Sequence, residues 1–134
     1  MATPDPGDGI DSLRQAAVSD CHALLAAETE LTAQLQHHAK VTEAMMRTME
    51  HGDSLVDTLR SNDSAQIRPA LSNSVRAFER ARHRARVRLI AVAMAEGATD
   101  QDIRELWNIS REIVTRAKRE LAALRASGGP TAHT

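Results

Sequence analysis

The side chains of this sequence that are best suited to chemistry are hydrogen-bond donors and cations, and they gather within residues 110–119. A helix that begins after Ser110 would expose four polar side chains, those of Arg111, Glu112, Thr115 and Arg116. An arginine can donate two hydrogen bonds to guanine, a threonine can contact the methyl group of thymine, and a glutamate can accept from cytosine. The alternative interpretation is a solvated helix face on which Glu112 pairs with Arg116.

Further cations flank this segment on both sides. Lys118 and Arg119 lie farther along the same expected helix, where a phosphate contact suits them better than a base contact. Upstream, arginines recur every four residues, with two more beside them: Arg76, Arg80, Arg84 and Arg88, then Arg82 and Arg86.

The upstream arginines have two possible roles. They could pair with acidic residues of the N-terminal half, which are Glu28, Glu30, Glu43 and Glu50. They could instead contact the phosphates of a nucleic acid. Pairing is favoured for Arg76 and Arg80, which lie farther from residues 110–119, and both roles stay open for Arg84, Arg86 and Arg88.

Catalytic and metal-binding patterns are missing from the sequence. It holds no Gly-rich phosphate loop, nucleophile elbow or Ser/His/Asp arrangement, so we expect no enzymatic activity and no cofactor. His37 and His38 point to different sides of a helix and have no carboxylate four residues later, so with His51 they predict no metal site. The single cysteine, Cys21, can form neither an internal disulfide nor a cysteine-based zinc site.

The charges are divided unequally along the chain. The formal net charge of −1 combines −7 over residues 1–65, where four basic groups face 11 acidic ones, with +6 over residues 66–134. Such asymmetry suggests that one half is adapted to a polyanion. Phe78 and Trp107 are the only aromatic residues, which argues against base stacking on aromatic side chains. The longest apolar run, residues 89–95, is too short for a membrane span, so we expect a soluble cytoplasmic protein associated with the nucleoid and no membrane contact.

Glycine and proline predict where helices begin and end. Only Gly52, Pro69 and Gly97 interrupt residues 10–127, and no stretch alternates as a strand would, so we expect an all-α protein with disordered tails at 1–9 and 127–134. The first helix should run from Asp11 towards Glu50 and stop at Gly52, with Asp53 or Ser54 capping the next one. A helix continuous through Gly52 is the alternative.

This first helix carries one apolar stripe, formed by Leu13, Ala17, Cys21, Leu24, Leu31, Leu35, His38, Met45 and Met49. The helix is too long for the rest of so small a chain to cover it, so we expect a second copy to cover the stripe. The residues assigned to dimerisation are Leu13, Leu24, Leu31, Leu35, Met45 and Met49.

The following segment should contain a turn and a second long helix. Residues 61–64 have turn chemistry, and Pro69 suits the first turn of a helix that ends at Gly97. Its seam is Leu71, Val75, Phe78, Arg82, Ala85, Leu89 and Val92, and a second apolar face holds Val87, Ile90, Ala91 and Met94. The regions expected are a dimerisation region at 10–68 and a DNA-binding region at 69–126.

Residues 98–119, ATDQDIRELWNISREIVTRAKR, predict two short helices around a tight turn. Thr99 or Asp100 can cap the first helix, Asn108 tolerates a left-handed turn, and Ser110 caps the second helix, which runs to about Arg125. On the second helix, Ile113, Val114 and Ala117 should face inward.

This stretch resembles the helix-turn-helix of bacterial regulators, as in LuxR-type, sigma-factor region 4 and resolvase-like families. Their motif is often close to E-I-A-x-x-L-G-I-S-x-x-T-V-x-R. Asp102-Ile103 stands for E-I, Trp107 for the apolar residue before the turn and Asn108 for its glycine, and residues 109–110 match I-S. Residues 113–114 stand for T-V, and Arg116 matches the last arginine. The small residue after E-I is here Arg104, which must extend towards solvent or push the two helices apart.

The resemblance covers about residues 85–126, and the N-terminal region matches no named family. It implies a wingless three-helix helix-turn-helix module, and together with the helical pattern of the preceding residues it predicts an all-α fold in which a long N-terminal coiled-coil-like helix or helical hairpin precedes that module. The resemblance, the positive charge of residues 66–134 and the over-long first helix together predict a homodimeric transcriptional regulator that binds double-stranded DNA. The alternative is a helical adaptor whose apolar stripe docks a protein partner and which binds no DNA. A DNA-binding chain whose N-terminal helix holds a protein partner is a further possibility.

Overall fold

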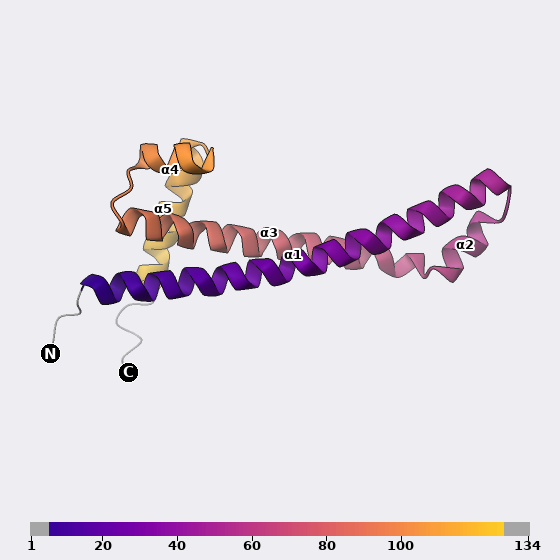
Figure 1. Cartoon of the computed structure of the whole chain (residues 1–134), viewed down its shortest axis with the longest axis horizontal. Helices are drawn as coiled ribbons and strands as arrows, with labels where there is room; N and C mark the ends of the chain where they lie inside the picture. The colour runs from indigo at the N-terminus through magenta and orange to yellow at the C-terminus, as the bar shows by residue number, and fades with distance from the viewer. Residues whose placement is uncertain (1–5, 128–134) are drawn as a thin grey trace. The chain divides into compact units, whose positions relative to one another are not determined.

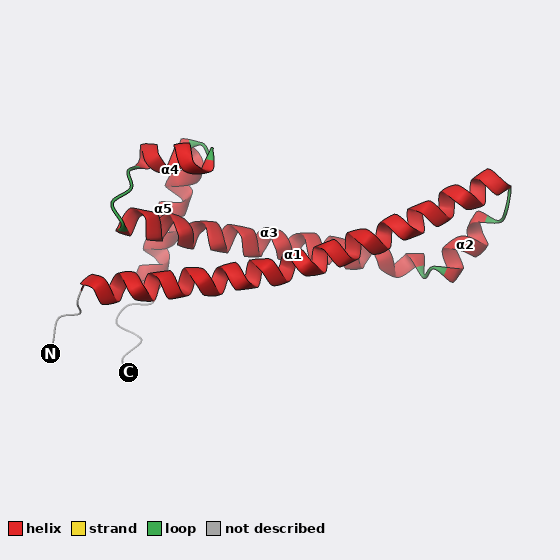
Figure 2. Cartoon of the chain, viewed as in Figure 1, coloured by secondary structure: helices red, strands yellow, loops and turns green. Residues whose placement is uncertain are grey.

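The computed structural model describes residues 6–127, and within them the fold is entirely helical (Figures 1 and 2). The five helices are α1 (Pro6–His51), α2 (Leu55–Ser61), α3 (Ser64–Ala95), α4 (Asp100–Trp107) and α5 (Arg111–Ser127). No strand occurs among these residues. The predicted all-α class and the long N-terminal helix are confirmed.

The first helix begins earlier than predicted. α1 starts at Pro6 instead of Asp11, so residues 6–9, which were expected to belong to a tail, are helical. Proline is compatible with the first helical position because the N–H that it lacks has no partner there. The other predicted tail residues, 1–5 and 128–134, lie outside the described part of the chain.

Glycine ends both long helices in the left-handed conformation, as the sequence predicts. Gly52 has φ +71° and Gly97 has φ +101°. After α1, the Gly52 N–H donates to the Met49 carbonyl (3.3 Å) and the Asp53 N–H donates to the Thr48 carbonyl (3.0 Å). The same pair of hydrogen bonds, each 3.0 Å long, follows α3. This is the Schellman pattern of helix ends, and the alternative of a helix continuous through Gly52 is wrong.

The second long helix also begins earlier than predicted. The turn at residues 61–64 is confirmed, because α2 ends at Ser61 and α3 begins at Ser64. Pro69 therefore lies inside α3 rather than in its first turn. A proline there leaves the carbonyl four residues earlier without its helical donor. That residue is Ala65, and it is exposed, so water can satisfy its carbonyl.

The chain divides into two compact units, and α1 and α3 contribute to both. The module unit holds the residues up to His22 and those from Arg82 onward, and the hairpin unit holds Ala23–Ala81. These units do not follow the predicted regions 10–68 and 69–126. In the module unit the start of α1 lies beside the end of α3, where Arg14 contacts Glu96.

In the hairpin unit, α1 and α3 bury a seam that combines β-branched and small side chains. Val41 of α1 is buried, as are Ile67, Ser74 and Ala81 of α3. Val41 also lines a groove together with Ile67 and Leu71, which places the two helices side by side. Because serine and alanine are small, they permit the close approach of two helices.

The predicted seam of α3 is correct at five of its seven positions and wrong at two. Leu71, Phe78, Ala85, Leu89 and Val92 are buried or half-buried, as expected. Val75 and Arg82 are exposed, and their neighbours Ser74 and Ala81 take the inward positions. The prediction favoured valine for its apolar surface, whereas close packing of the helices favours the small neighbour.

The stripe of α1 also differs from the prediction. One row of its buried and half-buried positions, mostly in steps of three and four residues, is Leu13, Ala17, Asp20, Leu24, Ala27, Leu31, Gln34, Val41, Met45 and Thr48, and the predicted Cys21 is half-buried beside this row. Leu35, His38 and Met49 are exposed in the single chain, so the cover of Leu35 and Met49 by a second copy stays a prediction. Leu13, Leu24, Leu31 and Met45 are half-buried by the chain's own helices, which the prediction of cover by a second copy did not anticipate.

Candidate nucleic-acid interface

The module unit is built on one apolar cluster shared by α3, α4 and α5. Its buried members are Val87 and Ile90 of α3, Ile103 of α4, and Val114 and Ala117 of α5. Met94, Trp107 and Ile109 are among the partly buried residues packed on it. The predicted second face of α3 is thus covered by the helices that follow, and the predicted inward side of α5 is confirmed.

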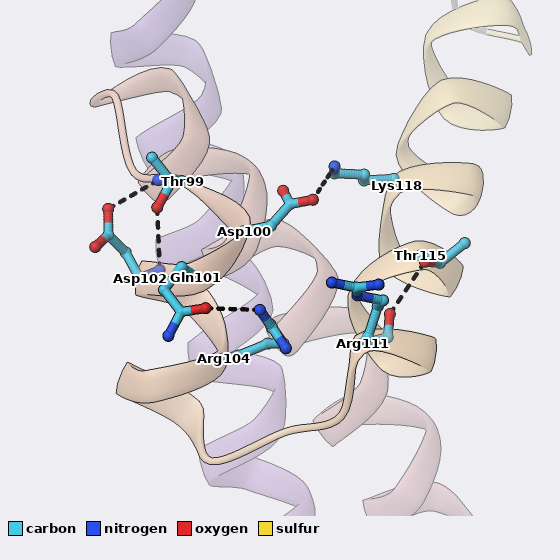
Figure 3. A network of polar contacts seen from close by, with 8 residues as sticks. All are labelled: Thr99, Asp100, Gln101, Asp102, Arg104, Arg111, Thr115 and Lys118. Atoms are coloured by element: carbon cyan, nitrogen blue, oxygen red, sulfur yellow. Dashed lines mark hydrogen bonds and ion pairs between the residues drawn. The ribbon is translucent and has the colours of Figure 1, made fainter.

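A capping box fixes the start of α4. Thr99 is the N-cap: its hydroxyl accepts from the Asp102 N–H (3.2 Å), and the Asp102 carboxylate accepts from the Thr99 N–H (2.9 Å; Figure 3). The hydrogen bond from the Thr99 backbone, followed by the contribution of its side chain, holds the pKa of Asp102 below its usual range. The ionised carboxylate therefore stabilises the start of the helix.

We expect this cap to weaken in acid. Because the pKa of Asp102 is lowered in the folded chain, its contribution to stability is fully present above the ordinary aspartate pKa. It is lost as the pH falls through the lowered value. The variant Asp102→Asn should unfold more easily than the wild type at neutral pH, and the two should converge in acid. Unfolding followed by Trp107 fluorescence measures this, and a difference that does not depend on pH contradicts the prediction.

A left-handed asparagine makes the turn between α4 and α5. Asn108 has φ 50° and ψ 45°, which is the conformation expected from the sequence. The Ile109 N–H donates to the Arg104 carbonyl (3.3 Å), and the Ser110 hydroxyl accepts from the Ile113 N–H (3.4 Å). Ser110 thus caps α5 as predicted, and α5 continues to Ser127 rather than Arg125.

Arg104 extends towards solvent instead of forcing the helices apart. Its side chain is half-buried, and its guanidinium donates to the Gln101 side-chain oxygen on the same helix (2.7 Å; Figure 3). The Arg104 Nε is buried, and no partner for it is found among the described residues. The helical pair therefore tolerates this departure from the motif at the expense of one unsatisfied donor.

The predicted contact residues of α5 share one exposed face. The exposed side chains are those of Ser110, Arg111, Glu112, Thr115, Arg116, Lys118 and Arg119. No Glu112–Arg116 ion pair occurs in the described part of the chain. The Thr115 hydroxyl donates to the Arg111 carbonyl (3.0 Å; Figure 3), so its proton is used within the helix while its methyl group stays available.

One of the predicted phosphate-binding cations already has a partner. The Lys118 Nζ lies 2.6 Å from an Asp100 carboxylate oxygen, which joins α5 to the start of α4 (Figure 3). Both side chains are about half exposed, so the pair is open to competition by a phosphate. The sequence predicts Asp100 only as a possible cap of α4, and spacing along the chain gives no sign of this contact.

The upstream arginines have different surroundings. Arg84 is exposed, Arg86 is half-buried, and the Arg88 Nε lies 3.3 Å from an Asp20 carboxylate oxygen of α1. Arg88 thus follows the pairing hypothesis, although its partner is not one of the four predicted glutamates. The favoured pairing of Arg76 and Arg80 with those glutamates is not found in the described residues, where both arginines are exposed.

A histidine–carboxylate contact fixes α5 on α3. The His83 Nε2 lies 2.8 and 2.7 Å from the two Glu120 carboxylate oxygens, and both side chains are nearly half exposed. The sequence analysis missed this contact because the two residues lie 37 positions apart. Together with the apolar cluster, it sets the direction in which α5 presents its exposed face.

Comparison of the chain with models of protein families, with curated proteins and with solved structures found no match. Among the described helices, none is both long enough and apolar enough to cross a membrane.

Proposed function

We propose that this chain is a sequence-specific DNA-binding protein that places α5 in the major groove and acts as a homodimeric transcriptional regulator. One observation carries the proposal. Arg111 and Arg116 lie exposed on the first turns of a helix that follows a tight turn after α4, while the opposite side of that helix is packed on the cluster around Ile103. A rigid helix with donors on its outer face is what contact with base edges requires.

Each exposed residue has a role in the proposed complex. Arg111 and Arg116 donate to guanine, and Thr115 contacts a thymine methyl group or a phosphate through its remaining groups. Lys118 and Arg119 contact phosphates, and Arg84 is the upstream arginine best able to join them, since Arg88 is held by Asp20. Two copies would bind two half-sites, which strengthens binding beyond that of a single small module.

Selection of bound sequences from a random pool of duplex DNA tests this proposal. We expect an enriched sequence that the chain binds more tightly than scrambled duplexes, with two related half-sites if the chain acts as a dimer. Affinity should fall steeply with added salt, because each phosphate contact contributes a slope of about −0.9 in log affinity against log salt concentration. A pool that shows no enrichment overturns the proposal and favours a helical adaptor that binds proteins only.

The variant Asp100→Asn should bind DNA more tightly than the wild type. The substitution releases Lys118 from its ion pair and removes a negative charge near the proposed phosphate contact. We expect a several-fold gain in affinity and a salt dependence steeper by about one phosphate contact. Glu105→Gln, on the same helix, removes an equal charge without releasing Lys118 and serves as the control. Equal effects of the two substitutions contradict the specific role of Lys118.

A further inference from the structure

One side of the hairpin unit is apolar and exposed. Leu25, Leu35, Met46 and Met49 of α1 are 51–59% exposed, and Val75 of α3 is 41% exposed. On α1 these residues fall into two sets of positions spaced by multiples of seven residues. Residues 25 and 46 belong to one set, and residues 35 and 49 belong to the other. We call these five residues the exposed apolar face. A regular helical stripe of this kind is typical of a surface that packs on another helix.

A groove lies beside the exposed apolar face. It has a volume of about 360 Å³ and runs between α1 and the start of α3. Its apolar lining residues are Val41, Met45, Leu59, Ile67 and Leu71. Leu35 lies about one to three helical turns before the α1 residues of this groove, so the hairpin unit carries a projecting leucine and an apolar groove close together.

The polar residues on this side of α1 can be covered without loss of hydrogen bonds. The Thr32 hydroxyl donates to the Glu28 carbonyl (2.8 Å), and the Thr42 hydroxyl donates to the His38 carbonyl (3.0 Å). These threonines therefore direct satisfied hydroxyls and methyl groups to the surface. Their burial by a partner would leave no unpaired donor.

Charge and shape on this face favour association with a second copy whose α1 runs in the opposite direction. Glu28 lies at one end of the face on α1, and Arg68 lies on the rim of the groove; neither has an ion-pair partner among the described residues. In a parallel pair, Glu28 would lie level with its own copy and Leu35 would meet Leu35. In an antiparallel pair, the Glu28 end of one copy lies near the Arg68 end of the other, and each Leu35 meets the other copy's groove.

We propose that two copies of this chain associate antiparallel through the exposed apolar face, with Leu25 of one copy level with Met49 of the other. This inference supplies the interface for the homodimer of the proposed function, but it does not depend on DNA binding. It keeps Leu35 and Met49 of the residues predicted for dimerisation and leaves out Leu13, Leu24, Leu31 and Met45, which each chain covers in part with its own helices.

Cross-linking tests the direction of pairing. Two variants are made in a Cys21→Ser background, one with Leu25→Cys and the other with Met49→Cys. Each variant by itself, and a mixture of the two, is treated with a short bismaleimide. We expect a cross-linked dimer only in the mixture, since residues 25 and 49 of one helix are about 36 Å apart at 1.5 Å per residue. A cross-link in either single variant indicates parallel pairing and overturns the proposal, as does no cross-link in any sample.

Light scattering tests the face itself. The wild type should have about twice the chain mass of 14.6 kDa, and Leu35→Lys should reduce it to one chain while helical circular dichroism is retained. Ala33→Lys, at an exposed position of α1 off the face, should remain dimeric. A wild type of single-chain mass that still binds its selected DNA overturns this inference and leaves DNA binding intact. A cross-linked antiparallel dimer that binds no DNA supports this inference and overturns the proposed function.

Discussion

Replacing both Arg111 and Arg116 with alanine is expected to lower affinity for the selected DNA sequence by roughly 30-fold to 10⁴-fold. Each bidentate arginine–guanine contact contributes about 1–3 kcal/mol of discrimination, so two lost contacts cost about 2–6 kcal/mol. Both side chains are exposed, so the fold should be unchanged. The loss should be much smaller on scrambled duplexes, because those are held mainly through phosphates.

The matched control for this double variant is Arg76→Ala with Arg80→Ala. These arginines are also exposed on a helix and have no ion-pair partner among the described residues, and they lie in the hairpin unit. Removing them takes away the same charge without touching α5. If both double variants weaken binding equally, and equally on selected and scrambled DNA, the effect is one of net charge, and α5 does not read the sequence.

Replacing Ile103 with alanine is expected to destabilise the module unit by about 2–5 kcal/mol, the usual cost of removing most of a buried isoleucine side chain. Ile103 is 0% exposed and lies in the cluster that joins α3, α4 and α5. Its loss leaves a cavity directly beneath the helix that presents Arg111. DNA affinity should therefore fall along with stability, although no contact residue has changed.

Urea unfolding measures this cost, and the single tryptophan provides a local signal. Trp107 packs on the same cluster as Ile103, so its fluorescence follows the module unit. Leu106→Ala is the control on the same helix: Leu106 is 72% exposed, and its truncation should change stability by no more than about 0.5 kcal/mol. Similar shifts for both variants would show that α4 is not anchored through Ile103.

The local features of the fold could be predicted because neighbouring residues create them. Thr99 and Ser110 cap their helices, Gly52 and Gly97 end theirs, and Asn108 takes the left-handed turn. Each depends on the backbone preference of one residue or on a hydrogen bond within one helical turn. The exposed face of α5 could be predicted for the same reason, because helical period alone separates Arg111 and Arg116 from Val114.

The choice between adjacent positions on the long helices could not be predicted in this way. Val75 is more apolar than Ser74, yet the serine is buried and the valine is exposed. The rotation of a helix about its axis is set by how closely its partner approaches, and small side chains permit the closest approach. On α1, Gln34 and Thr48 are half-buried while their neighbours Leu35 and Met49 are exposed, and both exposed residues belong to the proposed dimer interface.

The sequence by itself determined the helical class, the glycines that end the two long helices and the residues that α5 exposes, because these follow from local backbone chemistry and helical period. Tertiary structure alone decided which charges are already paired. Asp20 with Arg88, His83 with Glu120 and Asp100 with Lys118 are separated by 68, 37 and 18 positions. Pairing at such separations depends on how the helices pack and not on spacing along the chain. Packing therefore leaves Arg111 and Arg116 exposed for a partner while it holds Arg88 within the protein.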